Sequence, residues 1–214
     1  MSDTLRQALI ETALAMNASG INQGAAGNLS MRSEEGMLLT PSGMAYPDLA
    51  PEDIVFMDLD GNSEGLRQPS SEWRFHLDIY RQREDVQAIV HAHPVHCAAL
   101  ACLNRSIPAF HYMVAVAGGR NIRCAQYATF GTQALSDHVI AALADRNACL
   151  MANHGLIALG QSLSGALALA VEVENLANMY TRSLSIGEPV ILDNEEMDRV
   201  IEKFRFKRHN HRGG

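Results

Sequence analysis

The chain has 214 residues, of which 47% are hydrophobic and 19% charged, and this ordinary globular mixture excludes an intrinsically disordered protein. Its formal net charge of -7 at pH 7 argues against a nucleic-acid-binding surface, which would be basic. No apolar run approaches the roughly 20 residues that span a bilayer, and no signal-peptide pattern opens the chain, so we expect a cytoplasmic protein without a membrane partner.

The first half of the chain is predicted to combine an N-terminal helix with hairpin-connected strands. Apolar residues recur at helical spacing up to Gly20, a stop signal, and glycine-rich turns separate the short apolar segments that follow. Ser70 and Ser71 precede a segment with one apolar stripe, so either serine could cap a helix there. The predicted elements of this half are helices at 3–19 and 72–82 and strands at 28–32, 37–40, 53–59 and 88–93.

The second half is predicted to add two further strand regions and a long helix. Ala109–Ala117 is predicted as a strand that Gly118 ends, and Pro189 marks the exit from an Ala- and Leu-rich helix. After a helix that begins near Glu195, residues 204–214 are expected to form a basic, mobile tail. The predicted elements are helices at 96–103, 132–145, 162–184 and from 195, and strands at 109–117 and at 149–159, the last broken at 154–155.

These elements predict one α/β domain over residues 1–214. Helices and hairpin strands interleave without a regular strand–helix alternation, and neither an internal repeat nor a long linker divides them. We therefore expect a central mixed or antiparallel sheet flanked by helices. The four cysteines include no CxxC pair, which argues against a zinc knuckle or a redox dithiol and favours free thiols.

Three histidines are candidates for a metal site. His91 and His93 end a predicted strand, where residues two apart share a face, and Pro94 disfavours a helix at that point. Such a pair is a weak signal alone, since neutral histidines also occupy hydrogen-bonded structural positions. His154, beside Gly155 at a strand break, completes a set of three ligands that is typical of catalytic zinc. Imidazole ligands favour zinc or a related transition metal over magnesium or calcium.

The start of the predicted helix at 72–82 supplies an acidic candidate and an anion site. Glu72 either complements the helix dipole or serves as a catalytic carboxylate, and the local sequence leaves both interpretations open. Ser70, Ser71 and the free N–H groups at the helix start form a potential site for an anion.

Two loops offer further hydrogen-bond donors next to glycines. Asn28 follows Gly27, and Ser42 precedes Gly43, so the backbone could approach a ligand closely at both points. Residues of these types are also common in ordinary turns, and Asn28 could simply begin a strand. Together with the two serines they make a phosphate cradle plausible if the three clusters converge.

A series of motifs runs in order from Gly20 to Ala158. The motifs are Asn22-Gln-Gly, Ala26-Gly-Asn-Leu-Ser30, Leu39-Thr-Pro-Ser-Gly43, Pro69-Ser-Ser-Glu-Trp-Arg-Phe-His76, Val90-His-Ala-His-Pro-Val-His-Cys97, Leu103-Asn-Arg-Ser-Ile-Pro-Ala109, His111-Tyr-Met113, Tyr127-Ala-Thr-Phe-Gly-Thr132 and His154-Gly-Leu-Ile-Ala158. In type and spacing they resemble the class II aldolase family of sugar phosphates, most closely its members that act on L-fuculose 1-phosphate. The resemblance weakens after about residue 186.

The resemblance implies zinc-dependent retro-aldol cleavage of a ketose 1-phosphate, with L-fuculose 1-phosphate giving dihydroxyacetone phosphate and L-lactaldehyde. It implies one zinc ion per subunit, held by His91, His93, His154 and, in the resting enzyme, Glu72. Glu72 would then move the proton at the reacting carbon, and Tyr112 would act as an acid from the neighbouring subunit of a homotetramer. The implied phosphate-binding residues are Gly27, Asn28, Ser42, Gly43, Ser70 and Ser71.

The C-terminal region departs from the family. Members that act on L-fuculose 1-phosphate carry a tyrosine there, whereas this chain has none after Tyr180 and instead has Phe206, His209 and His211. The substrate preference could therefore differ. One alternative is a pentulose-5-phosphate 4-epimerase of the L-ribulose-5-phosphate type, which typically has aspartate where Glu72 stands. A second is a metal-free binding module like the adducin head, which the presence of all the implied ligands disfavours.

Overall fold

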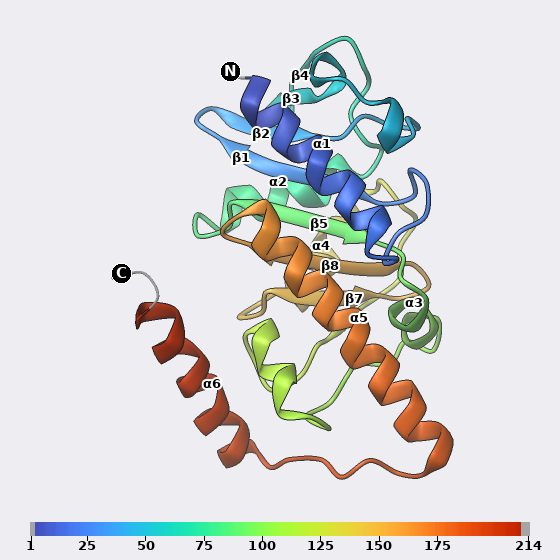
Figure 1. The fold of residues 1–214 in the computed structure, drawn as a ribbon, viewed down its shortest axis with the longest axis vertical. Coiled ribbons are helices and arrows are strands. Elements are labelled where there is room, and N and C mark those ends of the chain that lie inside the picture. The colour runs from blue at the N-terminus through green and yellow to red at the C-terminus, as the bar shows by residue number, and fades with distance from the viewer. Residues whose placement is uncertain (1–2, 211–214) are drawn as a thin grey trace.

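An eight-stranded sheet forms the middle layer of the molecule in this computed structural model, which describes residues 3–210 and side chains as far as Phe206 (Figure 1). The strands are β1 (Asn28–Ser33), β2 (Gly36–Leu39), β3 (Val55–Asp58), β4 (Ser63–Glu64), β5 (Ala88–Ala92), β6 (Cys124–Ala125), β7 (Ala148–Met151) and β8 (Gly155–Gly160). Their order is β4-β3-β2-β1-β5-β8-β7-β6, and neighbours are antiparallel except for the parallel pair β6 and β7. The predicted mixed sheet is confirmed.

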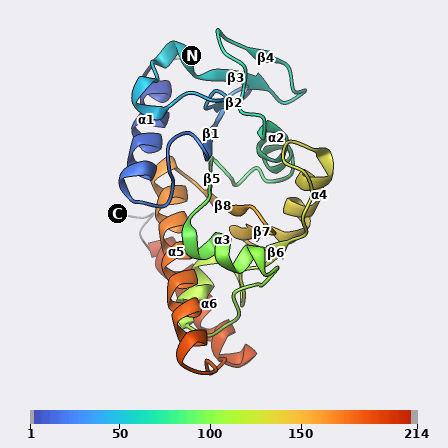
Figure 2. The same ribbon diagram turned by 90° about the vertical axis from the view of Figure 1, so that its right-hand side faces the viewer.

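Helices cover both faces of the sheet. The helices are α1 (Asp3–Ala18), α2 (Trp73–Gln82), α3 (Val95–Cys102), α4 (Gln133–Ala142), α5 (Leu163–Ile186) and α6 (Asn194–Asn210), with short 3-10 helices η1 (Tyr46–Asp48), η2 (Pro51–Asp53) and η3 (Tyr112–Ala117). Seen along the sheet, α1 and α5 lie on one side and α2 and α4 on the other (Figure 2). The predicted α/β class is therefore confirmed. No helix within residues 3–210 combines the length and apolarity needed to cross a membrane.

Strands β5 and β8 are buried on both faces, as expected for strands between two helical layers. Every residue of β5 is buried, and β5 pairs with β1 on one side and with β8 on the other. The long helix α5 packs on β5 and β8 through a stripe of small residues that includes Ala166, Ala170 and Ala177. The middle of the sheet is thus a rigid platform at the point where β5 ends.

The predicted strand Ala109–Ala117 is wrong, because most of this segment is the 3-10 helix η3. Val114 and Ala115 are adjacent and both buried, in a segment that packs against α5, a pattern that a helical turn provides and strand alternation does not. The side chain of His111 accepts a hydrogen bond from the backbone N–H of Met113 and so caps the helix. Gly118 ends it in the left-handed region, at φ 94°.

Two further expectations need correction at helix ends. Neither Ser70 nor Ser71 is the N-cap of α2, since Glu72 occupies that position and makes no capping hydrogen bond with its side chain. Helix α6 continues through Asn210, so residues 204–210 of the predicted tail are helical. The remainder of that tail, with His211, lies outside the described residues.

Candidate metal centre

His91 is the most deeply placed residue of the predicted metal set. It lies on β5 with no exposed surface, and its Nδ1 is 2.9 Å from the carbonyl oxygen of Leu156 on β8. A carbonyl oxygen only accepts, so Nδ1 carries the proton and donates it, which leaves the Nε2 lone pair free. This backbone contact sets both the tautomer and the ring orientation, as is usual for a metal-binding histidine.

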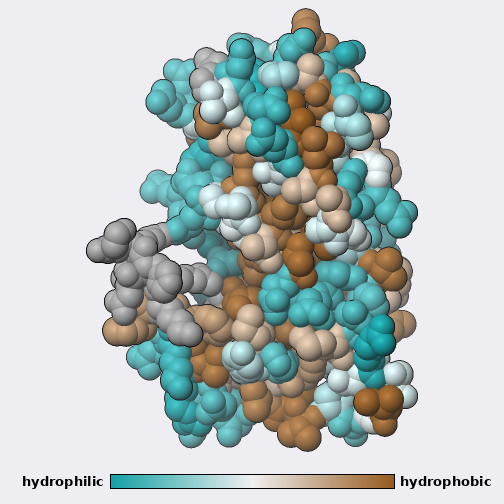
Figure 3. Space-filling model, in the orientation of Figure 1, coloured by the Kyte–Doolittle hydropathy of each residue, from teal (hydrophilic) through white to brown (hydrophobic). Residues whose placement is uncertain are grey.

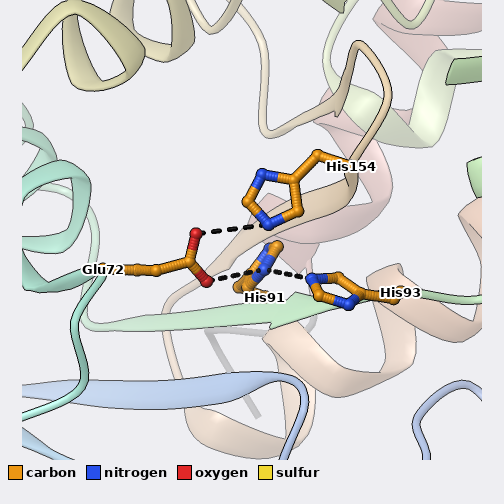
Figure 4. Close-up of side chains that lie close together, drawn as sticks. All are labelled: Glu72, His91, His93 and His154. Carbon is orange, nitrogen blue, oxygen red and sulfur yellow. Dashed lines mark hydrogen bonds and ion pairs between the residues drawn. The ribbon is translucent and has the colours of Figure 1, made fainter. Parts of the chain in front are cut away.

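The structure brings Glu72, His91, His93 and His154 together at the end of β5 (Figure 4). One ligand atom from each lies within 4.8 Å of those of the other three. The Nε2 atoms of His91 and His93 are 2.9 Å apart, and the Glu72 carboxylate reaches His91 at 3.1 Å and His154 at 3.2 Å. The four residues that the sequence analysis assigned to zinc therefore form one cluster.

Each residue reaches the cluster from a different point of the fold. His93 follows the last residue of β5, His154 comes from the turn between β7 and β8, and Glu72 begins α2. Gly155 permits the approach of that turn, because a Cβ there would lie 2.3 Å from the carbonyl oxygen of Ala92. Only glycine fits between the β7–β8 turn and the end of β5 without displacing one of them.

The charge states of the cluster suit a cation. Burial, followed by the proximity of His91, lowers the pKa of His93 and of His154 to about 4, so both rings are neutral near pH 7. Burial opposes ionisation of Glu72, but its contacts with His91, His154 and Asn28 outweigh that cost and lower the pKa to about 2. Neutral imidazoles and an ionised carboxylate are the forms that ligate metals.

Within the metal cluster, one buried oxygen lacks a hydrogen-bond donor among the described residues. Glu72 Oε1 accepts no hydrogen bond of acceptable geometry from any described residue, although His154 Nε2 lies 3.2 Å from it. A buried carboxylate oxygen without a donor is costly unless something else satisfies it. Three imidazole nitrogens and this oxygen match the donor set of a zinc-type site, so the residues present fit the implied metal.

The three clusters of predicted phosphate residues lie side by side. Thr40 N–H donates to the carbonyl oxygen of Leu29, and the carbonyl oxygen of Thr40 accepts from Ser70 N–H, both at 3.1 Å. Ser42 N–H donates to the carbonyl oxygen of Gln68 at 3.0 Å. The loops at 27–29, 40–43 and 68–71 are therefore neighbours, which spacing alone could not show. Ser42, Gly43 and Ser71 are exposed, while Gly27 packs so tightly that a Cβ there would lie 2.4 Å from the carbonyl oxygen of His91.

Two of the predicted phosphate residues also contact Glu72. Asn28 Nδ2 donates to Glu72 Oε2 at 3.0 Å, and Ser70 Oγ accepts from the Glu72 backbone N–H at 3.3 Å. The carbonyl oxygen of the Asn28 amide faces His76 at 2.6 Å. The sequence analysis missed this contact of His76, which its four-residue spacing from Glu72 on one helix side could have indicated.

Tyr112 lies apart from the metal cluster within the chain. It begins η3, is 50% exposed, and lines a groove between η3 and α6. Phe110, Phe204 and Phe206 form apolar walls of this groove, whose lining residues include none of the four cluster residues. We call it the Tyr112 groove.

Comparisons with known proteins agree with this geometry. The family model for the Class II Aldolase and Adducin N-terminal domain matches residues 7–181. The chain is 56% identical over 201 residues to the 5-methylthioribulose-1-phosphate/5-deoxyribulose-1-phosphate aldolase of Rhodospirillum rubrum, covering 94% of this chain and 91% of that relative. It is 52% identical over 202 residues to the L-fuculose phosphate aldolase of Escherichia coli K12, covering 94% of each.

A solved structure is similar over almost the whole length. The fold superimposes on that of an L-fuculose 1-phosphate aldolase with a TM-score of 0.93 and 42% sequence identity. The match covers 96% of this chain and 98% of the other.

Proposed function

We propose that this chain, which belongs to the Class II Aldolase and Adducin N-terminal domain family and is a class II aldolase, cleaves ketose 1-phosphates. The products would be dihydroxyacetone phosphate and an aldehyde. The observation that carries the proposal is the cluster of Glu72 with three histidines, in which no described residue donates a hydrogen bond to Glu72 Oε1.

The proposed metal is zinc, one ion per subunit. His91, His93 and His154 would each contribute a ring nitrogen, and Glu72 a carboxylate oxygen in the resting state. When bound, the ion would supply Lewis-acid stabilisation of the negative charge that cleavage leaves on the dihydroxyacetone phosphate fragment. The loops around Ser42 and Ser70 would position the phosphate through backbone and hydroxyl donors.

The protein side chains would carry the protons. In the condensation direction, the ionised carboxylate of Glu72 would take a proton from C3 of dihydroxyacetone phosphate, and the phenol of Tyr112 would donate its proton to the aldehyde oxygen as the bond between C3 and C4 forms. Cleavage would run the same transfers in reverse: the C4 hydroxyl would return its proton to Tyr112 as the bond breaks, the electron pair of that bond would stay with the ketone fragment as an enediolate, and Glu72 would return the proton to C3. Burial of Glu72 would limit the access of bulk water to that carbon.

The substrate is proposed from chemistry that the relatives' substrates share. L-Fuculose 1-phosphate, 5-deoxyribulose 1-phosphate and 5-methylthioribulose 1-phosphate all carry the phosphate beside the ketone and all end in a methyl group. We retain L-fuculose 1-phosphate as the expected substrate, and the 56% identical relative makes the two pentulose phosphates a second candidate. The apolar walls of the Tyr112 groove suit a methyl-bearing aldehyde.

A substrate panel tests this proposal. Zinc-loaded protein is assayed for dihydroxyacetone phosphate release from the three named sugars and from ribulose 1-phosphate, which differs from its 5-deoxy counterpart by one hydroxyl. We expect the methyl-ended sugars to be cleaved faster than ribulose 1-phosphate. A chelator should abolish activity and added zinc should restore it. Failure of the zinc-loaded protein to cleave any ketose 1-phosphate would rule out the proposal.

The epimerase alternative is tested with the same protein. L-Ribulose 5-phosphate is incubated with the zinc-loaded chain, and the xylulose isomer is sought by chromatography. We expect none, because Glu72 stands where the epimerases typically have aspartate and the relatives described above are named aldolases.

A homotetramer with shared active sites is also proposed. Tyr112 is half exposed in its groove, and apolar side chains run down the face that carries α1 and α5, where Leu14 and Val171 are exposed (Figure 3). Such apolar surface is typical of contacts between subunits. We expect light scattering to give four chains per particle. Co-expressed Glu72→Gln and Tyr112→Phe chains should recover activity, because random mixing rebuilds about one site in four.

A further inference from the structure

A row of five polar side chains leads from the metal cluster into the space between β1 and α2. Asn28 and Ser30 share a face of β1, since they are two residues apart. Glu72, His76 and Tyr80 share a side of α2 and its N-cap, since they are four residues apart. Two strand residues span about 6.6 Å and four helical residues about 6 Å, so successive side chains of the β1 row lie opposite successive side chains of the α2 row.

The row is continuous and buried. Asn28 bridges Glu72 Oε2 at 3.0 Å and His76 Nε2 at 2.6 Å. Ser30 Oγ then bridges His76 Nδ1 at 2.7 Å and the Tyr80 hydroxyl at 2.9 Å. The exposed fractions of the five residues lie between 0% and 5%. The row is therefore almost entirely shielded from solvent that could replace a lost partner.

Every hydrogen bond in the row has one possible direction. An ionised carboxylate only accepts, so Asn28 turns its NH₂ group to Glu72 and its carbonyl oxygen to His76. That carbonyl only accepts, so His76 Nε2 carries the proton and Nδ1 is an acceptor. Ser30 must then donate to His76 Nδ1, and Tyr80 must donate to Ser30. A single neutral tautomer of His76 sets the orientation of the Asn28 amide.

The far end of the row is anchored. The guanidinium of Arg32, two residues beyond Ser30 on β1, lies over the Tyr80 ring at 4.8 Å from its centroid. Arg32 also donates hydrogen bonds to the carbonyl oxygens of Tyr80 and Val86. These contacts hold β1 and α2 in one register.

We propose that His76 is a positioning residue of the metal centre, acting through Asn28 to fix the carboxylate of Glu72. Oε2 accepts a hydrogen bond from the Asn28 amide, and Oε1, to which no described residue donates, would be the oxygen available to a metal ion. Without His76, the carbonyl oxygen of Asn28 loses its buried donor, so the amide is held less firmly with its NH₂ group towards Glu72. The inference rests on the proposed function for the metal, and zinc binding tests it independently of turnover.

The test compares two substitutions of one residue. His76→Leu removes both ring nitrogens at similar volume, whereas the amide nitrogen of His76→Gln can still donate to Asn28. Zinc affinity is measured by competition with a chelating dye, and kcat by release of dihydroxyacetone phosphate. We expect His76→Leu to lose about 10- to 100-fold in zinc affinity, in kcat or in both. We expect His76→Gln to stay within about threefold of the wild type on both measures.

Two serine variants separate positioning from stability. Ser30→Ala removes the donor to His76 Nδ1, while Ser136→Ala removes an equally buried hydroxyl that donates to Asp78 between α4 and α2. Ser30→Ala deletes two buried hydrogen bonds, to His76 and Tyr80, and Ser136→Ala deletes one partly buried bond, so both should lower the unfolding midpoint, Ser30→Ala by more. Only Ser30→Ala should weaken zinc binding.

Two results would overturn the inference. Wild-type zinc affinity and kcat in both His76→Leu and Ser30→Ala would show that the row serves stability alone. Equal loss of zinc affinity in Ser136→Ala would show that the effect is not specific to the row. If the wild type cleaves no ketose 1-phosphate, the proposed function fails, and zinc affinity still decides the role of His76.

Discussion

The metal cluster and the Tyr112 groove are two parts of one proposed active site, and the chain builds them in opposite ways. Glu72 and His91 lie in the interior, held by backbone and side-chain contacts from three neighbouring elements. Tyr112 begins the 3-10 helix η3 with half its surface exposed, and it lines a groove between η3 and α6. One part is rigid within a single chain, and the other is open on its surface.

The two regions would bind different parts of the substrate. All the proposed substrates share the phosphate and the ketone, which the metal cluster and the neighbouring loops would bind. They differ at the aldehyde end, which Tyr112 would face. Such a division predicts that similar chains can act on different sugars, and the relatives of 56% and 52% identity are indeed named for different sugar phosphates. The rigid part can stay constant while the open part changes the substrate preference.

The largest expected effect comes from substituting Glu72 in the metal cluster, the rigid part of the site. Glu72→Gln keeps the shape of the side chain but removes the negative charge and the base, so kcat should fall by about 10⁴-fold. Zinc affinity should fall as well, because a neutral amide is a poorer ligand. Asp78→Asn is the matched control, since Asp78 is an acid on the same helix that accepts from Ser136 and Gln133. Activity of Glu72→Gln near that of the control would contradict the assigned role.

The next effect comes from the open part. Tyr112→Phe removes one hydroxyl from an exposed ring, so turnover should slow by about 10²-fold while zinc affinity stays unchanged. Tyr180→Phe is the control, because Tyr180 is a buried tyrosine that packs against Phe110 and has no part in the proposed proton transfers. Kinetics and dye competition on both variants check this prediction. A loss of zinc in Tyr112→Phe would mean that the two parts are not separate.

The same contrast explains what could be predicted from the sequence. His91 and His93 were predictable because strand alternation and Pro94 determine their direction locally. His154 was only a candidate, since its place depends on how β7 and β8 return beside β5. Segment 109–117 was predicted wrongly, because its helical form depends on packing against α5. The role of His76 depends on the register between β1 and α2, which local sequence does not encode.

A pair of glycine substitutions compares a tightly packed position beside the metal cluster with an open position elsewhere, by their effect on the free energy of unfolding. A Cβ on Gly27 would lie 2.4 Å from the carbonyl oxygen of His91, so Gly27→Ala must move β1 away from β5. We expect a loss of about 1–3 kcal/mol in the free energy of unfolding, together with weaker zinc binding. Gly187→Ala is the matched substitution at the C-terminal end of α5, where a Cβ meets nothing within 4 Å, and it should change stability by less than about 0.5 kcal/mol. Urea unfolding of both variants measures the difference.

The smallest expected effect is a pH dependence of the metal-free protein that arises in the rigid part. Burial lowers the pKa of His76 to about 3, against about 6.5 in an unfolded chain. Between these values the unfolded chain binds a proton that the folded chain does not, so stability rises with pH there. The contribution of His76 is therefore complete above about pH 6.5 and declines as the pH falls towards 3.

Urea unfolding of the zinc-free wild type and of His76→Gln, from about pH 7.5 to about pH 4.5, measures this contribution. Glutamine does not titrate, so the free energy of unfolding should fall more steeply on acidification in the wild type than in His76→Gln. The difference between the two slopes should correspond to the uptake of up to about one proton on unfolding. Equal slopes would mean that His76 takes up its proton in the folded state. The single neutral tautomer that orients Asn28 would then not persist, and the rigid part would owe its geometry to zinc instead of to the buried row.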